Sequence, residues 1–186
     1  MSGGLIEDGK GRGFKASVSS FLRLNVSSKS NPRIYYNSRV LGSAFTFVSE
    51  YSATSGDYVL YIKNTSTVNS LVISGVWASA DENAKWCIEK VEGVASGTDV
   101  VANPLNFSKK TTATADIKGS AAVTGLTKEA TVAASRSMAN TTIPMQFEDA
   151  LIIGSSTAIA IKYIGTAGDV SVTVGGHFEP HSEGVV

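Results

Sequence analysis

Three side chains late in the chain have the residue types and spacing of a metal site. His177, Glu179 and His181 alternate along an extended segment, so they would share one face, and imidazole and carboxylate groups are common zinc ligands. Pro180 breaks the strand within this set, and the sequence implies no fourth ligand. We therefore expect solvated polar residues here and no metal site.

Two pairs of adjacent carboxylates, Asp81-Glu82 and Glu148-Asp149, are candidates for the acid and base of glycoside hydrolysis. Neighbouring residues on a strand point to opposite faces, so neither pair forms a site by itself. We expect all four carboxylates to be solvated turn charges. The sequence also lacks the Gly-x-Ser-x-Gly turn of many serine hydrolases.

Cys87 is the only cysteine, so no internal disulfide can form, and between Trp86 and Ile88 it is expected to be a small buried hydrophobe. The glycines at positions 9, 11 and 13 follow no strand and lack the Gly-Lys-Ser/Thr ending of a phosphate loop. We therefore expect no catalytic residue, no cofactor and no enzymatic activity.

A basic, glycine-rich lead is the other concentration of functional side chains. Seven basic and three acidic residues give the first fifty positions a net charge of +4, and nine basic and thirteen acidic residues give the rest −4. Five glycines among the first thirteen residues leave the backbone many accessible states, so we expect residues 1–13 to be a flexible arm. The expected partner-docking residues are Lys10, Arg12, Lys15, Arg33, Tyr35, Tyr36 and Arg39.

Apolar and polar residues alternate with a period of two, which predicts that β-strands position these groups. Residues 44–51 and 57–63 are separated by a short polar link, which predicts a hairpin. A third strand, in which Gly75 marks a bulge or a close backbone contact, extends it into a meander. A second hairpin is predicted from residues 159–163 and 170–178. The residues expected to share the apolar faces of the first and third strands are Phe45, Phe47 and Tyr51, and Leu71, Ile73 and Trp77. The second hairpin is expected to point Ser171, Thr173 and His177 toward solvent.

Two segments leave alternatives open. Residues 79–82 fit a helix capping box, but imperfect alternation favours a strand from about residue 85 to 92, with a helix as the alternative. Residues 94–120 are rich in Ser, Thr, Ala, Lys and Gly and are predicted to be connections with one short strand near residues 99–102. Such a long connection either crosses from one sheet to the other or meets a partner.

These elements predict an all-β protein, an antiparallel β-sandwich of the jelly-roll type, with a barrel as the alternative. The expected boundaries are an arm at residues 1–13, a single sandwich at residues 14–180 and a tail at residues 181–186. Trp77 and Trp86 are expected in the core, whereas Tyr35 and Tyr36 are expected to be partly exposed. Unpaired strand edges favour assembly into a homo-oligomer.

Several phrases of the chain resemble structural proteins of tailed bacteriophages. The phrases are IEDGKGRGFKASV at residues 6–18 followed by Arg23-Leu24, YIKNTS at 61–66 leading to LVI at 71–73, WCIEKVEG at 86–93, ALIIG at 150–154 and the strand at 169–179. The resemblance implies a jelly-roll-like virion component, such as a head decoration or cement protein, a head fibre or a tail accessory protein. It brings no active-site residues.

The partner implied is the major capsid protein or another virion protein, with the chain itself forming a homo-oligomer, a trimer being favoured. The expected location is the virion after synthesis in the host cytoplasm, with no membrane partner. Nucleic acid is not an expected partner, because the basic region lacks interleaved aromatic residues and dense charge. Two other classes stay open: a tail- or fibre-associated carbohydrate- or receptor-binding module, and an enzyme with an unrecognised site.

Overall fold

The computed structural model describes residues 5–7, 15–18, 24–25, 38, 41–109 and 111–180. The chain divides into two compact units, Met1–Pro32 and Arg33–Val186. The strands of the first unit form a small antiparallel sheet in the order β1 (Leu5–Glu7), β2 (Lys15–Val18) and β3 (Leu24–Asn25). β1 falls inside the predicted arm, whose other residues lie outside the described ones, and the division at residue 32 is later than the predicted boundary at residue 13.

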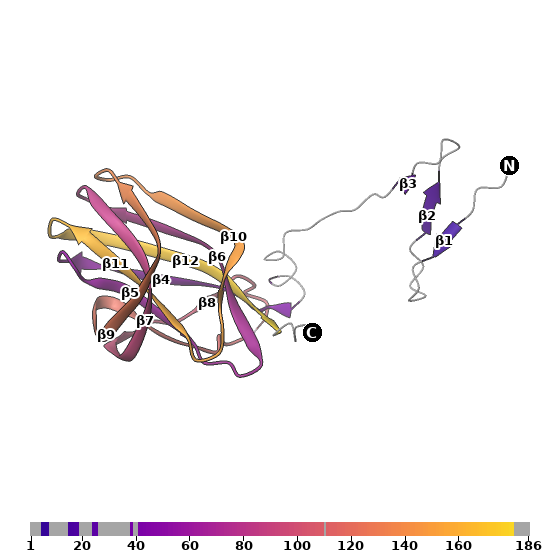
Figure 1. Ribbon diagram of the computed structural model, residues 1–186, viewed down its shortest axis with the longest axis horizontal. Coiled ribbons are helices and arrows are strands. Elements are labelled where there is room, and N and C mark those ends of the chain that lie inside the picture. Colours follow the sequence, from indigo (N-terminus) through magenta and orange to yellow (C-terminus); the bar gives the residue numbers. More distant parts are fainter. Residues whose placement is uncertain are drawn as a thin grey trace. The chain divides into compact units, whose positions relative to one another are not determined.

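The second unit is an all-β sandwich, as the sequence predicts (Figure 1). Five of its strands form an open sheet in the order β10-β6-β12-β4-β8, and β11, β5, β9 and β7 form a second sheet that closes on itself. The strands are β4 (Ala44–Ala53), β5 (Tyr58–Asn64), β6 (Asn69–Ala80), β7 (Ala84–Asp99), β8 (Asn103–Pro104), β9 (Ala115–Ser137), β10 (Ile143–Ile153), β11 (Ala158–Gly165) and β12 (Gly168–Pro180).

The strands of the sandwich pair in a nested order. β4 pairs with β12, β5 with β11, β6 with β10, and β7 with β9, all antiparallel. Both predicted hairpins are therefore wrong, since β4 and β5 lie in different sheets and so do β11 and β12. Each short link instead crosses between the sheets, which lets the apolar faces of consecutive strands pack against each other across one core.

The main core lies between the two sheets. Trp86 and Tyr163 are fully buried with ring centroids 5.3 Å apart, and Phe45 meets Phe178 edge-on at 5.9 Å. The predicted burial of Trp86 and Cys87 is confirmed. The inward row predicted for residues 44–51 is confirmed as well, because Phe45 and Phe47 belong to this core and Tyr51, which is partly buried, packs against it.

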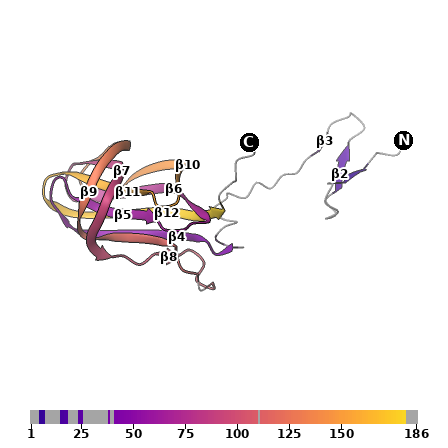
Figure 2. The same cartoon turned by 60° about the horizontal axis from the view of Figure 1, so that its bottom comes forward.

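A second, smaller core forms because β9 curves from β5 to β7 and so closes the second sheet (Figure 2). The first part of β9 pairs with β5, and the rest pairs with β7. The ribbon of β7 and β9 thereby covers the other face of β5 and β11. The buried residues of this second core are Tyr61, Val91, Val123, Ala158 and Ala160.

The bulge predicted at Gly75 is present, but its effect on Trp77 was not predicted. The pairing of β6 with β12 shifts register beside this residue, so that Gly75 and Ile73 oppose the consecutive residues Gly175 and Gly176. Leu71 and Ile73 are buried before the shift, and Val76 and Ala78 are buried after it. Trp77 therefore points outward with 36% of its surface exposed, and its prediction as a core residue is wrong.

The structure decides both segments that the sequence left open, residues 79–92 and residues 94–120. Residues 85–92 belong to β7, so the strand prediction is confirmed over the helix. Much of the predicted connection at residues 94–120 is strand, because β7 continues to Asp99 and β9 begins at Ala115. The short strand is β8, Asn103–Pro104, and not residues 99–102 as predicted. Because β8 pairs with β4, the segment crosses to the other sheet, which is one of the two predicted alternatives.

Candidate functional site

Most of the predicted docking residues lie outside the described part of the chain. These are Lys10, Arg12, Arg33, Tyr35, Tyr36 and Arg39. The backbone of Lys15 lies in β2 opposite Glu7, and its side chain is outside the described set. The basic docking set therefore stays a prediction.

The predicted metal set is not solvated as expected. His177 is fully buried, and it pairs with Ala44 and Val72, which are buried on the same face. The outer face of the sheet is thus covered at this end, which is why an outward-pointing residue is not exposed. His177 Nε2 lies 2.9 Å from Glu179 Oε1, and His181 lies outside the described residues. In the described part of the chain, no group of three or more His, Cys, Asp or Glu side chains is arranged to hold a metal ion.

The predicted carboxylate pairs lie at the surface. Asp81 and Glu82 are exposed at the bend between β6 and β7. Glu148 and Asp149 lie in a bulge of β10, with φ of 48° and 64°, and Asp149 Oδ1 accepts a 2.9 Å hydrogen bond from Ser74 Oγ. Asp81 lines a surface hollow together with Glu50 and Asp169.

A different carboxyl pair was missed because its members come from different strands. A hydrogen bond with Glu129 of β9 raises the pKa of Glu92 of β7, and the same bond lowers the pKa of Glu129. Lys90 Nζ lies 2.5 Å from Glu129 Oε2. The adjoining hollow of about 160 Å³ is smaller than the roughly 300 Å³ at which ligand pockets begin, so we assign no reaction to this pair.

Four exposed apolar residues on two hydrogen-bonded segments are a candidate site that the sequence did not reveal. Val101, Leu105 and Phe107 lie on the segment between β7 and β9, and their exposed fractions are 78%, 41% and 89%. Leu41, 47% exposed, lies on the segment that enters β4. We call these four residues the apolar end. Several exposed apolar side chains on neighbouring segments are a candidate interaction surface, whereas single exposed apolar residues are normal.

The apolar end is fixed to the sandwich by hydrogen bonds from both of its segments. Leu105 N donates to Ala44 O at 2.9 Å, and Asn106 Nδ2 donates to Ser38 O at 3.0 Å. Thr111 Oγ1 donates to Gly42 O at 2.5 Å. The apolar end therefore lies beside the residues that directly precede β4.

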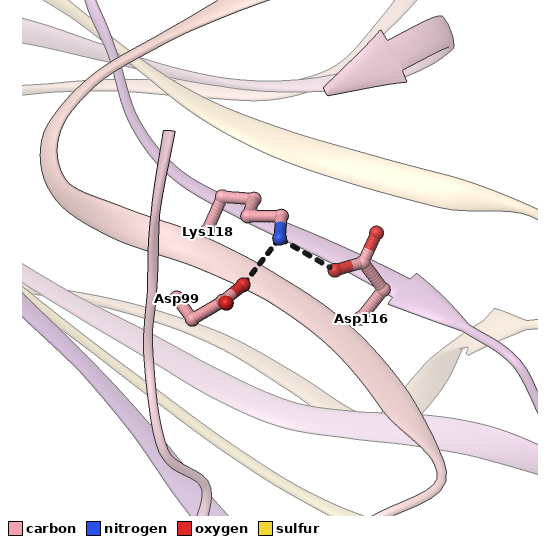
Figure 3. A network of polar contacts seen from close by, with 3 residues as sticks. All are labelled: Asp99, Asp116 and Lys118. Carbon is pink, nitrogen blue, oxygen red and sulfur yellow. Dashed lines mark hydrogen bonds and ion pairs between the residues drawn. The ribbon is translucent and has the colours of Figure 1, made fainter. Parts of the chain in front are cut away.

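A lysine between two carboxylates anchors the start of the segment that carries the cluster (Figure 3). Lys118 Nζ of β9 forms a close ion pair with Asp99, the last residue of β7, and lies 3.4 Å from Asp116 Oδ1. The hydrogen bond that Lys118 Nζ donates to Asp99 Oδ1 is the main cause that raises the pKa of Lys118. Val100 N, next along the chain, donates to Ile117 O at 3.1 Å.

A buried carboxylate ties the β7–β9 ribbon to the sheet beneath it. Glu89 is only 3% exposed, and its Oε2 accepts a 2.8 Å hydrogen bond from the Tyr58 hydroxyl. Lys128 Nζ of β9 lies 3.2 Å from Glu89 Oε1. Burial, the hydrogen bond and the charge of Glu89 together raise the pKa of Tyr58 to about 12. These two contacts join β7 to β5 and to β9, so we assign the trio a structural role.

No family model, curated protein or solved structure matches this chain. Among the described residues, no helix has the length and apolar character needed to cross a membrane. The geometry of the domain therefore carries the functional argument.

Proposed function

We propose that this chain is a non-enzymatic structural protein of a bacteriophage virion, a decoration or cement protein on the capsid. It docks through the apolar end and the basic residues that precede it. The resemblance of the sequence to phage structural proteins supplies the class. The single structural observation that carries the docking role is the apolar end, where Phe107 is 89% exposed on a segment held by hydrogen bonds.

In this proposal the sandwich is a jelly roll. Without the two-residue β8, eight strands remain, and the first pairs with the last, the second with the seventh, and so on inward. Such nesting of one long antiparallel ribbon supports a jelly roll, which carries two Greek keys in eight strands. Copies of the chain assemble on the shell as a homo-oligomer, a trimer being favoured.

The energetics of docking favour the apolar end over the arm alone. Ordering a flexible arm costs about 1–2 kcal/mol per residue, so an arm needs many contacts to bind. Burying a side chain such as Phe107 contributes about 1.5–3 kcal/mol and requires little ordering, because hydrogen bonds already hold its backbone segment. Many copies on a symmetric shell add avidity to a modest single contact.

The test measures occupancy on virions. Particles from a phage that encodes this chain are stripped of it and rebound with the full-length protein, with Leu105→Ser/Phe107→Ser, or with Val94→Ser. Val94 is 86% exposed on the β7–β9 ribbon, so it controls for the loss of an exposed apolar side chain elsewhere. We expect the double variant to lose about tenfold or more in occupancy and the control to bind normally. Absence of the chain from purified virions would overturn the virion role, and undiminished binding of the double variant would overturn docking through the apolar end.

A further inference from the structure

The outer face of the five-stranded sheet carries an aromatic side chain that lies flat on the backbone. Trp77 of β6 is paired with Thr173 of β12. A Cβ added at Gly75 would lie 3.1 Å from Cη2 of the Trp77 ring, and one added at Gly175 would lie 3.2 Å from Cζ3. The indole therefore occupies the space above two glycines that other side chains would fill. A ring held in this way offers a flat, preorganised apolar surface to solvent.

A hollow of about 730 Å³ opens on the same face. Ser79, two residues after Trp77, pairs with Ser171 of β12, which in turn pairs with Glu50 of β4, and all three line the hollow. Ser171 Oγ donates a 2.9 Å hydrogen bond to Glu50 Oε1, which fixes the carboxylate over the sheet. The polar residues at the far end of the hollow are Asp81, Asn140, Thr142 and Asp169.

We propose that Trp77 and this hollow form a binding site for a neutral glycan. One face of a sugar ring is a surface of C–H groups, which packs on an aromatic ring, while its hydroxyls both donate and accept hydrogen bonds. The hollow supplies hydroxyl, amide and carboxylate groups that match both roles. Carboxylates accept the strongest of these bonds, because charge-assisted hydrogen bonds exceed neutral ones.

The charges of the hollow select among glycans and against other ligands. Glu50, Asp81 and Asp169 contribute carboxylates, and none of the described lining residues is cationic. Acidic sugars and nucleic acid would therefore be repelled. Trp77 is not among the residues that line the hollow and lies two residues before Ser79 on the same face. Most of the lining residues are polar or charged, whereas the centre of a protein interface is typically apolar. A neutral glycan that spans from Trp77 to the hollow fits this arrangement of an aromatic platform beside many polar groups.

The site lies at the opposite end of the sheet from the apolar end. Ala44 of β4 is beside the apolar end, and Ser52 of the same strand lines the hollow. Eight residues of strand separate them, which at about 3.3 Å per residue is roughly 26 Å. Both sites can thus be occupied at once. The glycan site does not depend on the virion role, because its argument uses only this face.

The chain offers a direct readout of the proposed site. It has two tryptophans, and Trp86 is fully buried, so Trp77 is the one whose fluorescence a stacked sugar would change. The full-length protein is first screened on an array of neutral and acidic glycans. The best neutral oligosaccharide is then titrated against wild type, Trp77→Ala, Trp77→Phe, Glu50→Gln and the control Phe107→Ser, with calorimetry for the variants that lack Trp77.

We expect binding to neutral glycans with a shift in Trp77 emission, and little binding to sialylated glycans or heparin. Trp77→Ala should weaken binding by about tenfold or more, Trp77→Phe and Glu50→Gln should weaken it less, and Phe107→Ser should leave it unchanged. The buried Trp86 reports whether Trp77→Ala is folded. The proposal is overturned if no neutral glycan on the array binds, if acidic glycans bind as well as neutral ones, or if folded Trp77→Ala binds like wild type.

Discussion

Gly93 of β7 and Gly125 of β9 lie beside each other at the bend of the β7–β9 ribbon, and neither has room for a side chain because backbone of the other strand occupies that space. Their φ values are 111° and 77°. A Cβ on Gly93 would overlap the carbonyl oxygen of Gly125, and a Cβ on Gly125 would overlap that of Val94. The bend that lets β9 cover the second core therefore depends on this glycine pair.

Gly93→Ala and Gly125→Ala should each lower the free energy of unfolding by about 2 kcal/mol or more, because the new Cβ adds backbone strain and a clash with a carbonyl. Gly56→Ala is the matched control, since Gly56 also has a positive φ, 101°, but nothing lies within 4 Å of its added Cβ. Urea unfolding of the three variants measures the difference. If all three variants lose the same free energy of unfolding, the loss comes from backbone strain alone and not from the close approach of β7 and β9.

Ser137→Ala should destabilise the main core. The indole Nε1 of the fully buried Trp86 donates a 3.0 Å hydrogen bond to Ser137 Oγ, and removing the acceptor leaves a buried donor unsatisfied. The expected loss is about 1–3 kcal/mol by chemical denaturation. Ser135→Ala, two residues earlier in β9, is the control and should cost less. A wild-type stability for Ser137→Ala would mean that another group or a water molecule replaces the acceptor.

Stability should fall as the pH rises from about 10 toward 12. The folded pKa of Tyr58 is about 12 against an ordinary value of 10.0, so below pH 10 its contribution is fully present. Above pH 10 the unfolded chain releases this proton first, and the contribution is lost as the pH approaches the folded value. Urea midpoints at pH 8 and at about pH 11 measure the fall.

Tyr58→Phe should lower stability at pH 8 and reduce the additional loss on moving to about pH 11. Burial, as the largest cause, also raises the pKa values of Tyr51, Tyr61 and Tyr163, so the variant removes only part of the pH dependence. The same pH dependence in the variant and wild type would contradict the role of the Tyr58–Glu89 contact.

Lys118→Gln should loosen the segment that carries the apolar end with little change in global stability. Exposed ion pairs contribute only about 0–1 kcal/mol, yet this one joins Asp99 to β9 directly before Val100. Chymotrypsin cleavage after Phe107 should therefore become faster in the native protein. Asp116→Asn is the control, because it leaves the pairing of Lys118 with Asp99 intact. Equal cleavage rates in Lys118→Gln and wild type would refute the anchoring role.

The alternation of apolar and polar residues predicted which side of a strand is buried, but it did not predict which strands pair. Phe45, Phe47 and Trp86 are buried as expected, because a period of two depends only on local geometry. The hairpins were wrong because a short polar link is equally compatible with a turn between paired strands and a crossing between sheets. Pairing in this fold is nested, so the partner of β4 is β12, more than a hundred residues away.

The two main errors in side-chain placement have identifiable causes. The bulge at Gly75 was recognised, but its consequence is that every later residue of β6 changes face, which exposes Trp77. His177 has the expected outward direction, but Val72 and Ala44 beside it are buried too, and no strand pattern reports what covers a sheet. The apolar end was missed because its residues lie in a segment without periodicity.

Nested pairing also sets an order in which the domain can form. The β7–β9 pair is the closest in sequence, so its loop-closure entropy is the smallest, and we expect structure to begin there and spread outward. β11 lies between β5 and β7, and β12 lies between β4 and β6, yet these two central strands are synthesised after all other strands of the domain. A nascent chain that ends before Ala158 therefore leaves unpaired edges in both sheets, and one that ends before Gly168 still leaves them in the five-stranded sheet. The sandwich can be completed only after its last strand has been translated.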